Sequence, residues 1–208
     1  DRIFDHMMLD GLEDAYEPGR SMGTFGEDCA AKYGFTRAEQ DAFATASVER
    51  AKAATASGAF AAEITPVTVK SRAGETVVSV DEGPGKVKLD KIASLKPAFK
   101  KDGTITAASS SSINDGAAAL VMMRASTATK LGCKPLARIV GHATHAQEPE
   151  WFATAPLGAT QKALAKAGWA VGDVDLWEIN EAFAVVPMAL MKELNLPHDK
   201  VNVNGGAC

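Results

Sequence analysis

The N-terminal part of the chain carries apolar positions at helical spacing. Over residues 3–16 apolar side chains recur among acidic ones at near-helical intervals, which predicts a helix that Glu17-Pro18-Gly19 ends. A second, shorter helix is expected over residues 24–32, closed by Gly34.

The start of the next helix has a recognisable cap. Thr36 and Glu39 have the spacing of a capping box, in which the threonine hydroxyl accepts from a free backbone N–H and the glutamate reaches back. The alanine-rich run that follows has high helix propensity, so we expect a helix to about Ser57 that ends at Gly58.

Beyond Glu63 the pattern changes from helical to β-branched. Residues 64–69 and 76–80 flank Arg72-Ala73-Gly74, an order that predicts a hairpin. Residues 81–91 are polar and contain Gly83-Pro84-Gly85, so we expect a loop there.

The rest of the chain alternates between strand and helix patterns. Residues 117–123 are continuously apolar, and the run is short enough to favour a buried strand. The full prediction is strands at 104–107, 117–123, 136–140 and 174–179, and helices at 157–167 and 183–194. This alternation predicts a layered α/β sheet, with the preceding helices and hairpin forming an inserted lobe.

Composition excludes several classes of partner. The 208 residues carry a net charge of −4, which gives no basic surface for nucleic acid. No apolar run is long enough to cross a bilayer and no signal-like segment opens the chain, so no membrane partner is expected. Three cysteines make no disulfide framework, which favours a reducing cytoplasm or organelle matrix.

The first segment with candidate chemistry is residues 106–119, which contains four consecutive serines. Small residues let a ligand chain pass close to the backbone, and hydroxyls can bond amides of that ligand. The alternative is a flexible serine linker, although linkers rarely run straight into apolar strands on both sides.

The second segment is residues 177–184, where Asn180 and Glu181 separate a predicted buried strand from an apolar helix. Ligands usually bind at the carboxyl ends of strands in open α/β sheets. An amide there can hold a water or donate to a developing oxyanion. The alternative is that Asn180 caps the helix.

Other reactive side chains are weaker candidates. His142 and His145 have an odd spacing that puts their rings on opposite faces of a strand, so no metal site is expected. Cys29 in a helix and Cys133 in a turn are expected to be structural thiols, and Cys208 is not expected to be catalytic.

The two candidate segments, followed by Val-Asn-Val-Asn-Gly-Gly-Ala-Cys at residues 201–208, resemble the signatures of the thiolase family. Met22-Gly23 and the stretches at residues 39–44, 95–99 and 162–169 agree with the same family. The order and spacing match along essentially all 208 residues. The resemblance implies an enzyme that joins or splits acyl groups carried on coenzyme A.

The resemblance also implies a domain plan. Thiolases have a layered α/β fold of two similar halves, with an α+β coenzyme A-binding loop domain inserted in the first. On this mapping residues 1–113 belong to the loop domain, 114–132 close the first half and 133–208 begin the second. We therefore expect a partial thiolase-like fold, an internal piece of a longer protein. We expect that protein to form a homo-oligomer, a dimer or tetramer.

The family pattern places most of its catalytic groups outside this chain. It has a nucleophilic cysteine upstream of residue 1, a histidine shortly after Gly205-Gly206, and a second cysteine beyond. The fourth group matches Asn180, whose amide would hold a water that stabilises the enolate oxygen. The substrate would be a coenzyme A thioester, with no cofactor. The chain alone is expected to be inactive; the alternative function is a non-catalytic module binding coenzyme A or a lipid carrier.

Coenzyme A contacts are better represented in the chain. By the family pattern the pantetheine and adenine path is lined by Leu12, Met22, Phe99, Ala107, Ser111, Ser112 and Ile113, and the acyl end by Phe152, Ala182 and Phe183. Ser111 is expected to bond a pantetheine amide, whereas the apolar members could simply pack in a core. Ser21 replaces a histidine that many thiolases have, the four serines replace Asn-Ala-Ser-Gly, and no arginine lies near Gly83-Pro84-Gly85.

Overall fold

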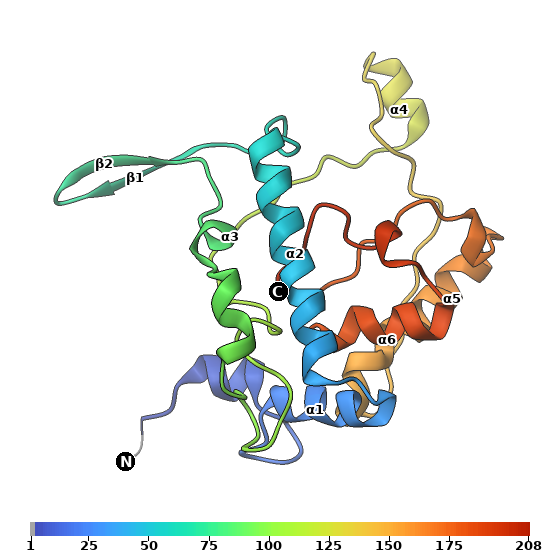
Figure 1. Cartoon of the computed structure of the whole chain (residues 1–208). Helices are drawn as coiled ribbons and strands as arrows, with labels where there is room; N and C mark the ends of the chain where they lie inside the picture. Colours follow the sequence, from blue (N-terminus) through green and yellow to red (C-terminus); the bar gives the residue numbers. More distant parts are fainter. Residues whose placement is uncertain (1–2) are drawn as a thin grey trace.

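Helices dominate the computed structural model, which describes residues 3–208 (Figure 1). The α-helices are α1 (Met22–Tyr33), α2 (Arg37–Ser57), α3 (Gly83–Lys86), α4 (Ala125–Lys130), α5 (Ala155–Ala167) and α6 (Val185–Leu194). A π-helical turn, η1 (Met8–Leu12), precedes them. Short 3-10 turns are η2 (Leu89–Ser94), η3 (Pro149–Thr154), η4 (Val171–Asp173) and η5 (His198–Lys200).

Helix α2 follows the sequence prediction closely. The hydroxyl of Thr36 accepts from the Glu39 N–H at 3.2 Å, and the Thr36 N–H donates to the Glu39 carboxylate at 2.7 Å, which confirms the capping box. Gly58 ends the helix in the left-handed conformation, with φ of 70°. One face of α2 is buried, through Gln40, Phe43, Ala44, Ser47, Val48 and Ala54.

The core lies where α1, η3 and α6 meet. Its buried members are Cys29, Ala30, Ile105, Ala153, Ile179, Phe183, Val185, Val186, Ala189, Leu190, Leu196 and Val201. Gly26 of α1 allows a close approach here, because a Cβ at this position would lie 2.6 Å from the Ile105 Cδ1. The predicted helices over 24–32, 157–167 and 183–194 are confirmed, with ends that differ by at most two residues.

The hairpin is also confirmed, although the bounds of its strands differ from the predicted ones. Strands β1 (Val67–Ser71) and β2 (Gly74–Val78) pair antiparallel, from Val67 opposite Val78 to Ser71 opposite Gly74. It projects away from the rest of the fold (Figure 1).

Pro84 lies in the first turn of α3, where its fixed φ suits a helix, so the predicted loop contains a short helix.

Several predictions of regular structure are wrong. The helix predicted over 3–16 is shorter, and its regular part ends with η1. Residues 117–123 and 136–140 are not strands, and their apolar side chains are exposed, with Val121 at 88% and Leu136 at 104%. Within residues 3–208 no neighbouring strand pairs with them, and an apolar run becomes a strand only when its backbone groups find such a partner. The predicted strand at 174–179 is reduced to one parallel bridge, between Trp177 and Val201.

The predicted strand at 104–107 is replaced by a different arrangement. The buried carboxylate of Glu27 accepts from the backbone N–H groups of Thr104 and Ile105, each at 2.9 Å. A Cβ on Gly103 would lie 2.2 Å from the same carboxylate. A side chain of α1 thus satisfies the donors that a neighbouring strand would have taken.

Among the described residues, none of the helices combines the length and apolar character needed to traverse a bilayer.

Candidate active site

The serine segment and the Asn-Glu segment lie side by side. The Ser111 N–H donates to the Ala182 carbonyl at 3.1 Å, and the Ala184 N–H donates to the Ser109 carbonyl at 2.9 Å. Ser110 and Phe183 form the antiparallel bridge between these two bonds. Because its backbone is bonded on one side to another segment, the serine run is not a flexible linker.

The four serines divide into two structural and two accessible ones. The Ser109 hydroxyl accepts from the Thr106 N–H at 2.9 Å, and the Ser110 hydroxyl donates to the Thr106 carbonyl at 2.7 Å. These bonds fold the turn that presents the following residues. Ser111 and Ser112 are exposed, and the Ser112 hydroxyl accepts from an Asn114 amide at 2.6 Å. Ser111 is therefore exposed beside Ala182, and its contact with a ligand stays a prediction.

Asn180 occupies the exposed position between two buried residues, Ile179 and Glu181. It does not cap the helix that follows, because α6 begins at Val185 and its N-cap is Ala184. The capping alternative is therefore wrong. The amide side chain lies at the surface of a segment whose neighbours are fixed in the core.

Three of the predicted aromatic residues form one cluster. The Phe183 ring lies 5.7 Å from that of Phe99, edge to face, and 6.4 Å from that of Phe152. Phe25 completes the cluster, 6.3 Å from Phe152, and was not predicted. Gly23 leaves room for Phe99, since a Cβ there would come within 2.1 Å of its ring.

These aromatic side chains pack against the core. The packing alternative therefore describes what Phe99, Phe152 and Phe183 do in this structure, as it also does for half-buried Ala182. Whether the same side chains line a ligand path stays a prediction.

The other predicted contact residues are more scattered. Met22 begins α1 and is half-buried, next to the glycine that contacts Phe99. Ala107 is exposed on the turn before the serines. Leu12 is half-buried in η1, and Ile113 is 69% exposed in the extended segment after the serines, so neither joins the aromatic cluster.

Glu181, to which the sequence pattern assigned no role of its own, is 1% exposed. Its carboxylate accepts from the Ser47 hydroxyl and from an Asn202 amide N–H, both at 2.7 Å. It also accepts from the Cys208 backbone N–H at 2.9 Å. The only sequence signal was a carboxylate next to an apolar helix, where burial demands partners.

The thiols of Cys29 and Cys208 have the character of unreactive groups, whereas Cys133 is exposed. Burial raises the pKa of Cys29 to about 11. Burial and the nearby Glu181 carboxylate raise the pKa of Cys208 well above its usual range. A nucleophilic cysteine needs a lowered pKa, so neither environment activates its thiol.

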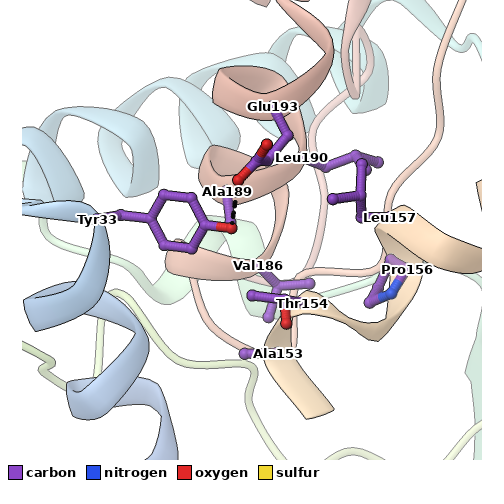
Figure 2. Close-up of a pocket in the computed structure, with 9 residues that line it drawn as sticks. All are labelled: Tyr33, Ala153, Thr154, Pro156, Leu157, Val186, Ala189, Leu190 and Glu193. Atoms are coloured by element: carbon purple, nitrogen blue, oxygen red, sulfur yellow. Dashed lines mark hydrogen bonds between the residues drawn. The ribbon is translucent and has the colours of Figure 1, made fainter. Parts of the chain in front are cut away.

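Two pockets are lined by other parts of the chain. The first is a closely packed seam between α1, η3, α5 and α6, where the Tyr33 hydroxyl donates to Glu193 at 2.8 Å (Figure 2). Burial, followed by this bond, raises the pKa of Tyr33. The second is a groove of about 550 Å³ bordered by the end of α2, the base of the hairpin and residues 204–206. Neither is lined by a predicted coenzyme A contact.

One of the two histidines considered for a metal, His145, has other partners. His145 contacts Gln147 through one ring nitrogen and Lys162 through the other, both at 3.1 Å. In the part of the chain from residue 3 onward, no three His, Cys, Asp or Glu side chains are grouped to hold a metal ion.

Comparison with known proteins identifies the class. The family described as "Thiolase, N-terminal domain" matches residues 1–126, and "Thiolase, C-terminal domain" matches residues 133–208. The chain belongs to the thiolase family, as the sequence motifs predicted.

The relatives that it resembles carry a more particular name. A probable acetyl-CoA acetyltransferase of Dictyostelium discoideum is 52% identical over 206 residues, which is 99% of this chain and 50% of that protein. An acetyl-CoA acetyltransferase of Paracoccus denitrificans is 48% identical, over 99% of this chain and 53% of that protein. The chain thus spans about half the length of the curated relatives it matches.

A solved structure gives the fold. The crystal structure of the Bacillus anthracis acetyl-CoA acetyltransferase superimposes with a TM-score of 0.92 at 43% identity, over 97% of this chain and 51% of that one. The predicted thiolase-like α/β fold class is therefore confirmed. The exposed segments around residues 117–123 and 136–140 thus belong to a chain whose overall course is that of a thiolase.

Proposed function

We propose that the protein containing this chain is an acyltransferase of the thiolase type. It would transfer an acyl group to or from acetyl-CoA, by Claisen condensation in one direction and thiolysis in the other. The juxtaposition of Ser111 with the segment from Asn180 to Phe183 carries the proposal. Support also comes from the family and from relatives named as acetyl-CoA acetyltransferases.

In this proposal the chain supplies binding and electrostatic stabilisation. The amide of Asn180, with a water that it holds, stabilises the negative charge that develops on the thioester oxygen as the enolate forms. By the family pattern, the nucleophilic cysteine, the histidine that activates it and the second cysteine would come from parts of the protein other than these 208 residues.

Coenzyme A would lie across the surface of the loop domain, residues 1–113. Ser111 bonds a pantetheine amide, and the remaining contacts to the carrier and its acyl group come from Leu12, Met22, Phe99, Ala107, Ser112, Ile113, Phe152, Ala182 and Phe183. The whole protein is proposed to act as a homo-oligomer in a reducing compartment, without a metal or other cofactor.

Thiolase turnover is expected from the full-length protein and not from the 208-residue chain. Turnover of the full-length protein and of the 208-residue chain is measured as cleavage of acetoacetyl-CoA by free coenzyme A. The readout is the loss of the enolate absorbance. Turnover by the isolated chain would contradict the assignment of the nucleophile to another part of the protein. Binding of coenzyme A by the full-length protein without turnover would instead support the non-catalytic module.

Replacing Ser111 by alanine in the full-length protein is expected to raise the KM for acetoacetyl-CoA about fivefold, the cost of one net hydrogen bond. The kcat should change little, because the bond is present in the ground state and the transition state alike. Ser94→Ala, at an exposed serine of η2, is the matched control and should leave both constants unchanged. An unchanged KM in the Ser111 variant would remove this residue from the site.

A further inference from the structure

Ile179, the residue before Asn180, has both its backbone N–H and its backbone carbonyl in hydrogen bonds with one side chain. The Asn202 side chain accepts from the Ile179 N–H at 2.7 Å and donates to the Ile179 carbonyl at 2.8 Å. This two-point contact replaces the neighbouring strand that a backbone would otherwise use. Asn202 is itself 2% exposed, so water does not compete for these bonds.

Asn180 also precedes a residue that is held by its side chain. The Glu181 carboxylate receives donors from three places, namely Asn202, Ser47 of α2 and the Cys208 backbone. All three partners donate and the carboxylate only accepts, so each bond has one defined direction. Asn202 belongs to both sets of contacts, and the residues on either side of Asn180 are therefore locked by one network.

The turn that carries Asn202 is fixed in its own right. The Asn202 N–H donates to the Trp177 carbonyl at 2.8 Å, and Arg50 of α2 donates to the Val201 carbonyl at 2.7 Å. The backbone of Asn202 is left-handed, with φ of 47°, a conformation that asparagine tolerates better than most residues.

The same network holds the C-terminal stretch. The Gly206 N–H donates to the Ser47 hydroxyl at 2.9 Å, and a Cβ on Gly206 would lie 2.2 Å from the Glu181 carboxylate carbon. Residue 206 must therefore be a glycine, because any larger side chain would clash with the Glu181 carboxylate. One buried carboxylate thus joins the Asn180 segment, α2 and the stretch that ends at Cys208.

We propose that Glu181 and Asn202 are positioning residues, which fix the exposed amide of Asn180 and the backbone of residues 206–208 relative to each other. The inference rests on the proposed function, because it supplies the geometry that the Asn180 amide needs. An amide stabilises a developing charge only from a fixed place, and a displacement of about 1 Å can cost on the order of a hundredfold in rate.

The decisive variant is Asn202→Asp in the full-length protein. Aspartate has the same shape and also tolerates the left-handed backbone, but it places a carboxylate oxygen against Glu181 and the Ile179 carbonyl. We expect kcat for acetoacetyl-CoA cleavage to fall roughly a hundredfold, with KM within about twofold of wild type, because the coenzyme A contacts are untouched.

A polarity swap separates positioning from general damage. In the double variant Asn202→Asp/Glu181→Gln, the new glutamine amide can donate to the new aspartate, and kcat should recover about tenfold over Asn202→Asp alone. Glu178→Gln makes the same chemical change at an exposed carboxylate of the same segment and should leave kcat unchanged.

The outcomes are distinct. An inactive wild-type protein would refute the proposed function, whereas an active one with unchanged kcat in Asn202→Asp would refute only the positioning role. A loss in kcat that the double variant does not reverse, with KM and the unfolding midpoint moving in parallel, would show a purely structural network and also overturn it. If Asn202→Asp does not fold, the kcat and KM of Glu181→Gln alone test the positioning role. A lower kcat with a nearly unchanged KM supports it, and an unchanged kcat refutes it.

Discussion

Replacing Asn180 by alanine in the full-length protein is expected to lower kcat for acetoacetyl-CoA cleavage by roughly 10²–10³-fold, the usual effect of losing one oxyanion donor. The loss falls on kcat because the oxygen gains its charge only in the transition state. Asn180 is exposed between buried neighbours, so the truncation leaves no cavity and stability should hardly change.

Steady-state kinetics of Asn180→Ala measure the loss of kcat, and an unfolding curve of the same variant measures its stability. Gln161→Ala removes an exposed amide from α5, away from the site, and should have wild-type kinetics. Asn180→Asp, which keeps the shape and loses the donor, should be as slow as Asn180→Ala. Wild-type kcat in both Asn180 variants would mean that this amide has no part in the reaction.

The second large effect concerns stability and falls on Gly205. Its φ is 83°, and a Cβ would lie 2.4 Å from the Ser47 carbonyl oxygen and 2.5 Å from the Ala51 nitrogen. Both are backbone atoms of α2, which cannot rotate away as a side chain could. Left-handed strain and overpacking each cost about 1–3 kcal/mol, so Gly205→Ala should lose about 2–6 kcal/mol of unfolding free energy.

Gly168→Ala provides the matched control. Gly168 ends α5 at φ of 70°, but a Cβ there meets nothing within 4 Å. That variant should lose only the cost of a left-handed alanine, about 1–2 kcal/mol. Urea unfolding of both variants, made in the full-length protein, measures the difference. Equal losses would show that α2 does not press against the glycine pair.

Local features were predictable from sequence because their partners are close in the chain. The capping box of α2 needs only Thr36 and Glu39, and the hairpin needs a turn between two β-branched runs. The approach of Ser111 to Ala182 was different. It followed from the family resemblance, since no periodicity relates segments so far apart.

What the sequence did not predict depends on distant partners. Glu181 meets Ser47 across 134 positions of sequence, and Glu27 takes the backbone donors of a segment 77 positions away. A buried carboxylate requires hydrogen-bond donors, but the sequence does not show which residues supply them. The same limit explains residues 117–123, because their apolar pattern indicates burial while strand pairing depends on a neighbour that periodicity does not specify.

We propose that Ser111 and the segment from Asn180 to Phe183 together receive a coenzyme A thioester. A crystal structure of the full-length protein with bound acetoacetyl-CoA tests it most directly. We expect the Ser111 hydroxyl to lie within hydrogen-bond distance of a pantetheine amide and the Asn180 amide to face the thioester. A pantetheine chain bound elsewhere, with both residues facing solvent, would contradict it.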